Sequence, residues 1–113
     1  MTDRINVLGE EYQIVVDKSG TNPKLESSFG YTEPYSKKIV IDDNITDDST
    51  MSVENLDAFV RQIYRHEVVH AFFYESGLSY KFDKDEEDFL VDWIAKMVPK
   101  MQKIFKEMGV SEQ

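Results

Sequence analysis

The chain has 113 residues, a length that suits one domain built on one modest hydrophobic core. Its hydrophobic content of 41% is typical of globular proteins, and its formal net charge of −9 excludes a general attraction to nucleic acids or anionic membranes. The chain has no cysteine, which excludes disulfide bonds and leaves only nitrogen and oxygen ligands for a metal ion.

The N-terminal part of the chain has the pattern of β-strands. Apolar and polar residues alternate over residues 4–17 on either side of a glycine, which predicts two strands joined in a hairpin. Residues 18–24, KSGTNPK, predict a turn, and residues 25–36 predict an extended segment with a short strand near Gly30. Residues 36–43, SKKIVIDD, predict a further strand with a β-branched centre. We expect that strand to have a free edge, to which an extended peptide can add as a further strand.

A long helix is predicted after an acidic loop over residues 42–50. Apolar residues recur at three- and four-residue spacing from about Ser52, which is suited to capping the N-terminus of a helix. The pattern continues to about Ser76, and Gly77 stands where a helix C-terminus is commonly capped.

A second helix is predicted from about Asp85 to Met108, before Gly109. Pro99 lies inside it, so we expect a kink or a break there. Its apolar stripe, which we expect to pack in the core, consists of Leu90, Trp93, Ile94, Met97, Met101, Ile104 and Phe105. The lysines beside the stripe are interpreted as a solvated face: Lys96, Lys100, Lys103 and Lys106.

The order of these elements indicates the fold class. Strands come first and two long helices follow, which predicts an α+β fold with a small, mostly antiparallel sheet packed on the helices. We expect residues 1–113 to form a single domain. No apolar run is long enough for a membrane span or a signal peptide, so a cytoplasmic protein is expected.

Both histidines of the chain lie in the first predicted helix, within the sequence HEVVH. Residues four apart on a helix share one face, so His66 and His70 are placed to bind one metal ion, for which Zn2+ is the best fit. Glu67 lies beside them and is suited to accept a proton from water at that ion. This pattern is the chemical signature of zinc peptidases.

A third protein ligand is then needed, and it must be an acid because no third histidine or cysteine exists. The second helix begins with an acidic cluster, DKDEEDFLVDWIA, over residues 83–95. This cluster also suits the N-terminus of a helix, where the helix dipole favours negative charge.

The combination of HEVVHAFFYESGL, the acidic cluster and VDWIA resembles small zinc metallopeptidases of phages and prophages, relatives of the ImmA/IrrE-type gluzincins. The segment GYTEPYSKKIVIDD resembles the strand region that precedes the motif helix in that family. The resemblance extends over roughly residues 5–100. It implies a minimal zincin fold, with a small sheet above the motif helix. It also implies a glutamate as third zinc ligand, four residues before an Asp or Asn that supports a histidine.

Carried onto this chain, the resemblance makes His66 and His70 metal ligands, Glu67 the general base and Asp92 the acid that orients a histidine. The position four before Asp92 is occupied by Asp88 instead of a glutamate, and its side chain is one methylene shorter. Glu87 is the alternative ligand, although it points about 100° away around the helix. The family often has a tyrosine that stabilises the oxyanion, and the candidates here are Tyr31, Tyr35, Tyr74 and Tyr80.

Two functions follow from these features. The first is a zinc-dependent metallopeptidase that cleaves a peptide bond in a specific protein substrate. The alternative is a zincin scaffold that is weak or inactive as an enzyme and binds a partner, such as an acidic inhibitor or adaptor encoded by a phage. The acidic net charge favours a basic partner in the second case. Intact Glu67 favours the first, because a purely structural zinc site has no use for a base.

Overall fold

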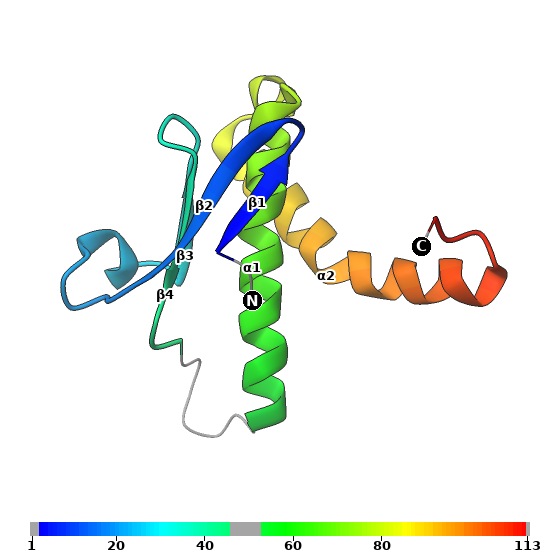
Figure 1. Cartoon of the computed structure of the whole chain (residues 1–113), viewed down its shortest axis with the longest axis horizontal. Helices are drawn as coiled ribbons and strands as arrows, with labels where there is room; N and C mark the ends of the chain where they lie inside the picture. Colours follow the sequence, from blue (N-terminus) through cyan, green and yellow to red (C-terminus); the bar gives the residue numbers. More distant parts are fainter. Residues whose placement is uncertain (1–2, 46–52, 113) are drawn as a thin grey trace.

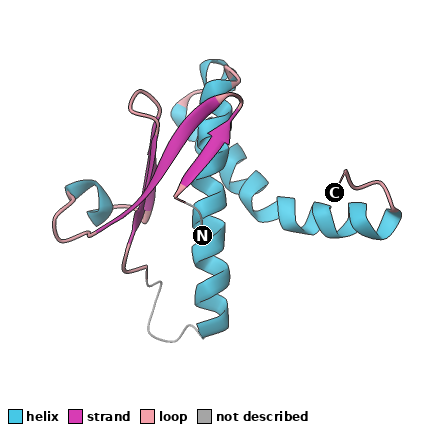
Figure 2. Ribbon diagram, in the orientation of Figure 1, coloured by secondary structure: helices cyan, strands magenta, loops and turns pink. Residues whose placement is uncertain are grey.

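The computed structural model describes residues 3–45 and 53–112 and has the α+β architecture that the sequence predicts (Figures 1 and 2). Its elements are β1 (Arg4–Val7), β2 (Glu10–Asp17), the 3-10 helix η1 (Pro23–Glu26), β3 (Gly30–Glu33), β4 (Lys38–Asp42), α1 (Val53–Glu75), the 3-10 helix η2 (Leu78–Lys81) and α2 (Lys84–Met108). The expected cap at Ser52 and most of the expected acidic loop lie outside the described residues. No helix of the described part is both long and apolar enough to cross a membrane.

The four strands form one sheet, in the order β1-β2-β4-β3. The expected hairpin joins β1 to β2, with its turn at Leu8 and Gly9, both of which have positive φ. The sheet is mixed, because β2 pairs with β4 in parallel while β3 pairs with β4 antiparallel. Two of the three strand pairs are antiparallel, so the expectation of a mostly antiparallel sheet is confirmed, and β2–β4 is the parallel exception. Residues 39–42 of β4 are all buried, which suits a strand in the middle of a sheet.

The central place of β4 has a consequence for substrate binding. Both of its edges are already paired, with β2 on one side and β3 on the other, so the expectation that this strand offers a free edge is wrong. Of the two edge strands, β1 and β3, it is β3 that lies beside the middle of α1, where the Thr32 hydroxyl is 2.8 Å from the Glu67 carbonyl oxygen. This strand lies very close to its neighbours at Gly30, where an added Cβ would meet the Val40 carbonyl oxygen at 2.9 Å. Glycine at this position permits that close approach.

The core lies between the sheet and α1. Its most buried side chains are Val7, Tyr12, Ile39, Ile41, Ile45 and Ala71. The C-terminal end of α1 is tied to the sheet by Glu75, which accepts a hydrogen bond from the Tyr12 hydroxyl at 2.6 Å and pairs with Lys37 at 2.6 Å. This contact fixes the position of α1 relative to the sheet, and with it the position of the residues that α1 carries.

The second helix, α2, continues through Pro99 as one helix, and Figure 1 shows it bending part way along its length. Proline has no N–H group, so the carbonyl oxygen of Ala95, four residues earlier, loses its helical donor. The Nε of Arg65, on α1, donates to that oxygen at 2.9 Å. The structure therefore confirms the expected kink but not a break, since a side chain from α1 replaces the missing hydrogen bond.

The apolar stripe of α2 is divided at about the same point. Before Pro99, Val91 and Ala95 are fully buried against the body of the protein. After it, every residue from 100 to 112 is exposed, and Figure 2 shows this part of α2 pointing away from the sheet and α1. The expectation that the whole stripe packs in the core is therefore wrong for Met101, Ile104 and Phe105. Trp93, also expected in the core, is 48% exposed.

Candidate metal centre

Both histidines and Glu67 lie near the middle of α1, on the face that looks toward β3 and the start of α2. The helix ends at Glu75 and Gly77 follows in the left-handed conformation, with φ of 85°. The chain then turns through η2 and starts α2 at Asp83. The Asp83 side chain accepts a hydrogen bond from the N–H of Glu86, and the Glu86 side chain accepts one from the N–H of Asp83. This capping box fixes the helix start that brings the acids back over α1.

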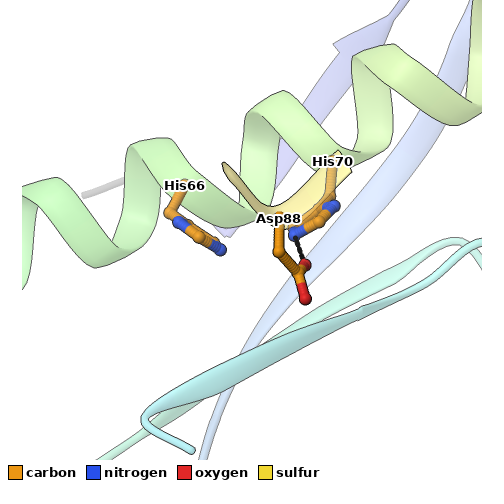
Figure 3. A group of neighbouring side chains, drawn as sticks. All are labelled: His66, His70 and Asp88. Carbon is orange, nitrogen blue, oxygen red and sulfur yellow. Dashed lines mark ion pairs between the residues drawn. The ribbon is translucent and has the colours of Figure 1, made fainter. Parts of the chain in front are cut away.

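Three of the predicted residues form a group that is able to hold a metal ion. His66, His70 and Asp88 each offer one ligand atom, and these atoms lie within 4.8 Å of one another (Figure 3). The two imidazole rings are 4.9 Å apart between centroids, one turn of helix from each other. Asp88 approaches them from the second helix. Residues that are far apart in the sequence thus converge on one point.

The two acids that compete for the role of third ligand approach His70 from opposite sides of its ring. Glu87 Oε2 is 2.7 Å from the Nδ1 atom of His70, and Asp88 Oδ1 is 3.3 Å from its Nε2 atom. A hydrogen bond from Nδ1–H to Glu87 leaves Nε2 without a proton and free to bind a metal ion. In this arrangement Glu87 holds the His70 ring in orientation. Asp88 lies on the Nε2 side, where a metal ion would bind both residues.

His66 has its own acidic neighbour. Its Nδ1 atom is 3.7 Å from Asp92 Oδ1, and Asp92 also pairs with Lys96 at 2.9 Å. Burial lowers the pKa of His66, and the neighbouring His70 lowers it further, while Asp92 and Asp88 act in the opposite direction. The structure therefore places Asp92 beside a histidine, where the resemblance expects it. Metal ions bind the neutral form of histidine, and a lowered pKa favours that form.

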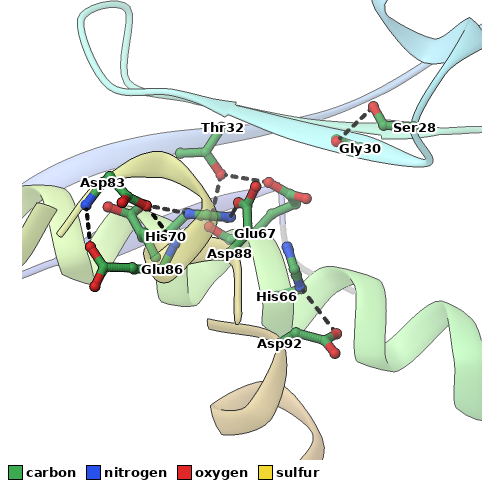
Figure 4. Close-up of polar contacts among 11 residues, drawn as sticks. Ser28, Gly30, Thr32, His66, Glu67, His70, Asp83, Glu86, Asp88 and Asp92 are labelled. Atoms are coloured by element: carbon green, nitrogen blue, oxygen red, sulfur yellow. Dashed lines mark hydrogen bonds and ion pairs between the residues drawn. The ribbon is translucent and has the colours of Figure 1, made fainter. Parts of the chain in front are cut away.

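Glu67 is the buried acid of the site, with only 6% of its surface exposed. The Thr32 hydroxyl, on β3, lies 2.9 Å from Glu67 Oε1 and 2.8 Å from the backbone carbonyl oxygen of the same residue (Figure 4). Burial raises the pKa of the Glu67 carboxyl, against the opposite effects of His70 and of the Thr32 hydrogen bond. A carboxylate with a raised pKa is a better proton acceptor than an exposed one.

The contribution of Thr32 is not predictable from the sequence. It is one of several polar residues in an ambiguous segment, and only the pairing of β3 at the sheet edge brings it over α1. The role of Glu87 beside Nδ1 was missed for a similar reason. Its direction around α2 was foreseen, but the position of α2 relative to His70 depends on tertiary packing. Neither position is marked by a motif.

These side chains open onto one pocket of about 1120 Å³ between β3, α1 and the start of α2. Its lining includes His66, Glu67, His70, Asp88 and Asp92. Of the four candidate tyrosines, Tyr31 and Tyr74 line the pocket, while Tyr35 and Tyr80 are 91% and 78% exposed and lie outside its lining. The Tyr31 hydroxyl accepts a hydrogen bond from the Asn22 side chain at 2.8 Å, so Tyr74 is the candidate that the geometry favours.

Comparison of the chain with protein-family models, with curated proteins and with solved structures finds no match. The resemblance to the small zinc metallopeptidases thus stays a prediction that depends on the motifs alone. The function is therefore inferred from the site itself.

Proposed function

We propose that this protein is a zinc-dependent metallopeptidase that cleaves a peptide bond in a protein or peptide substrate. The observation that carries the proposal is the position of Glu67, a buried carboxylate that faces the same pocket as His66, His70 and Asp88. A structural metal site has no use for a base at this place, whereas hydrolysis requires one. A phage or prophage origin and a place in the host cytoplasm belong to the same proposal.

The donor set fits zinc. Two imidazole nitrogens and one carboxylate oxygen are ligands that Zn2+ takes in catalytic sites, where the fourth position stays open for water. Ligand atoms on a tetrahedral zinc ion are roughly 3.3 Å apart, as follows from the usual zinc–ligand distances. The atoms of His66, His70 and Asp88 lie within 4.8 Å. To bind zinc, the three ligand atoms must therefore move closer together, which small rotations of their side chains allow. The short side chain of Asp88 suits a helix that passes this close to His70.

Zinc held by these residues would lower the pKa of water and polarise a substrate carbonyl group. The side chains of the protein transfer the proton and orient the ligands. Glu67 accepts the proton of the attacking water and later delivers it to the leaving amine. The Thr32 hydroxyl near Oε1 fixes the carboxylate, which leaves Oε2 as the atom that exchanges the proton. Glu87 and Asp92 hold the imidazole rings in orientation.

The β3 strand supports a peptide as the substrate. It is an edge strand, and Gly30, Tyr31 and Thr32 line the pocket. The backbone N–H of Asp42 donates to the Phe29 carbonyl oxygen. Backbone groups alternate in direction along an antiparallel pair, so those of Tyr31 point toward β4 and those of Gly30 and Thr32 point toward the open edge. The Gly30 carbonyl oxygen faces this edge, where it accepts a hydrogen bond from the Ser28 hydroxyl at 3.1 Å. An extended peptide added at this edge would pass directly over Glu67.

Zinc-loaded protein should be incubated with a mixed peptide library and the products identified by mass spectrometry. We expect cleavage by the wild type and a loss of at least roughly a hundredfold in Glu67→Gln, which removes the base but keeps the size of the side chain. Both proteins should bind zinc equally. Zinc binding without cleavage in the wild type would overturn the enzyme and favour the alternative of a partner-binding zincin scaffold.

A further inference from the structure

The exposed half of α2 has an apolar seam that the rest of the chain leaves uncovered. Among the apolar residues of this half, Met101 is 38%, Ile104 50%, Phe105 46% and Met108 67% exposed. Figure 1 shows this half of α2, coloured orange to red, extending beyond the rest of the molecule. A contiguous apolar surface of this kind commonly marks a protein–protein contact.

The spacing of this seam is that of a coiled coil. Leu90, Ile94, Met97, Met101, Ile104 and Met108 follow one another at four, three, four, three and four residues. This alternation is the heptad pattern that packs a helix along another helix. The last four of these residues extend over about 18 Å of helix, and within the described residues no other part of the chain buries Met101, Ile104 or Met108. The seam therefore calls for a helical partner.

The charges beside the seam indicate which partner fits. Lys100 and Glu107 flank the seam on the same side, one heptad apart, and within the described residues neither has an ion-pair partner. If two copies of this helix lie antiparallel with Met101 of each opposite Ile104 of the other, Lys100 of each copy faces Glu107 of the other. Val98 and Phe105 then meet on the opposite side of the seam. The surface is thus complementary to itself, as a two-fold symmetric contact requires.

We propose that the exposed half of α2 binds a second copy of this chain as an antiparallel helix pair. The contact involves residues 97–108 and lies away from the pocket, so it does not depend on the proposed peptidase activity. Pro99 lies on the side of the helix away from the seam, so its missing N–H group does not face the second copy.

An anionic membrane is the other surface that a basic amphipathic helix fits. Four lysines stand against a single glutamate between residues 96 and 108, but the chain as a whole has a net charge of −9. The rest of the molecule would be repelled by such a membrane. Glu107 pairs with a lysine in the contact with a second copy, but it would be repelled by an anionic membrane. The second copy is therefore the better partner.

A charge-swap experiment tests the proposal. The mass in solution is measured by sedimentation over roughly 1–500 µM protein, a range that covers weak dimers. We expect the wild type to rise from one chain toward two. Lys100→Glu and Glu107→Lys should each weaken the dimer by roughly tenfold or more, because each places like charges opposite one another twice. The double variant exchanges the charges and should restore the wild-type behaviour.

The control is Lys103→Glu, which changes the charge as much as Lys100→Glu but lies off the seam, and it should dimerise as the wild type does. All these positions are exposed, so circular dichroism should show an unchanged fold. A wild type that stays at the mass of one chain over the whole range would overturn the proposal. So would a double variant no better than the single ones, or binding to anionic vesicles by a protein that forms no dimer.

Discussion

The two halves of α2 are continuous in sequence and in helical structure, yet they have opposite surroundings. The first half packs on α1, buries Val91 and Ala95 and supplies Asp88 and Asp92 to the site. The second half carries an equally regular apolar stripe and buries none of it within the described chain. Apolar periodicity thus shows that a helix has a face to cover, but it does not show whether the cover comes from the same chain.

The largest difference between the two halves of α2 is expected in how much a buried or exposed apolar residue contributes to stability. Val91 is fully buried, and Val91→Asp leaves a charge without a partner in the core, so we expect a loss of about 3–5 kcal/mol in the free energy of unfolding. Ile104→Asp should change this free energy by less than about 0.5 kcal/mol in dilute protein, because the residue is exposed. Denaturant unfolding measures both. Equal losses would mean that the second half also packs on the body.

The same substitution, glutamate to glutamine, should affect zinc affinity in the first half of α2 but not in the second. Glu87→Gln replaces the carboxylate that accepts the His70 Nδ1–H bond, so we expect zinc to bind roughly 10- to 100-fold more weakly. Glu107→Gln is the same change in the exposed half and should leave the affinity as it is. Competition with a chromophoric chelator gives both values. A complete loss of zinc in Glu87→Gln would instead make Glu87 a direct ligand.

The junction between the halves depends on Arg65. Arg65→Met leaves the Ala95 carbonyl oxygen buried without a donor, and we expect a loss of about 1–3 kcal/mol. Arg61→Met, at an exposed position on the same helix, should have almost no effect. Thermal unfolding distinguishes them. Equal melting temperatures in the two variants would show that water satisfies the carbonyl group as well as Arg65 does.

The smallest effect is expected from removal of the second half. A chain that ends at Pro99 retains the residues that line the pocket, the three proposed ligands and the two buried residues of α2, Val91 and Ala95. We expect its zinc affinity to stay within about threefold of the wild-type value, since distant regions contribute independently. Isothermal titration measures it. A large loss would show that the two halves are coupled.

Much of this structure was predictable from local patterns. The helices and strands follow from apolar periodicity, and the spacing of His66 and His70 fixes their common face once the helix is known. The parallel pairing of β2 with β4 was missed because strand order is set by contacts between distant segments. For the same reason, nothing in the sequence indicated that Thr32 would lie over Glu67. The exposed stripe shows the same limit, because a pattern describes a surface and not the group that covers it.

Zinc binding tests the central claim most directly. The metal content should be measured after dialysis against zinc for the wild type, His70→Ala and Asp88→Asn, with Glu87→Gln alongside. The proposed site predicts one zinc ion per chain in the wild type, none in His70→Ala, and a greater loss in Asp88→Asn than in Glu87→Gln. A wild type that binds no zinc, or that keeps it when His70 is removed, would contradict the site and the function that depends on it.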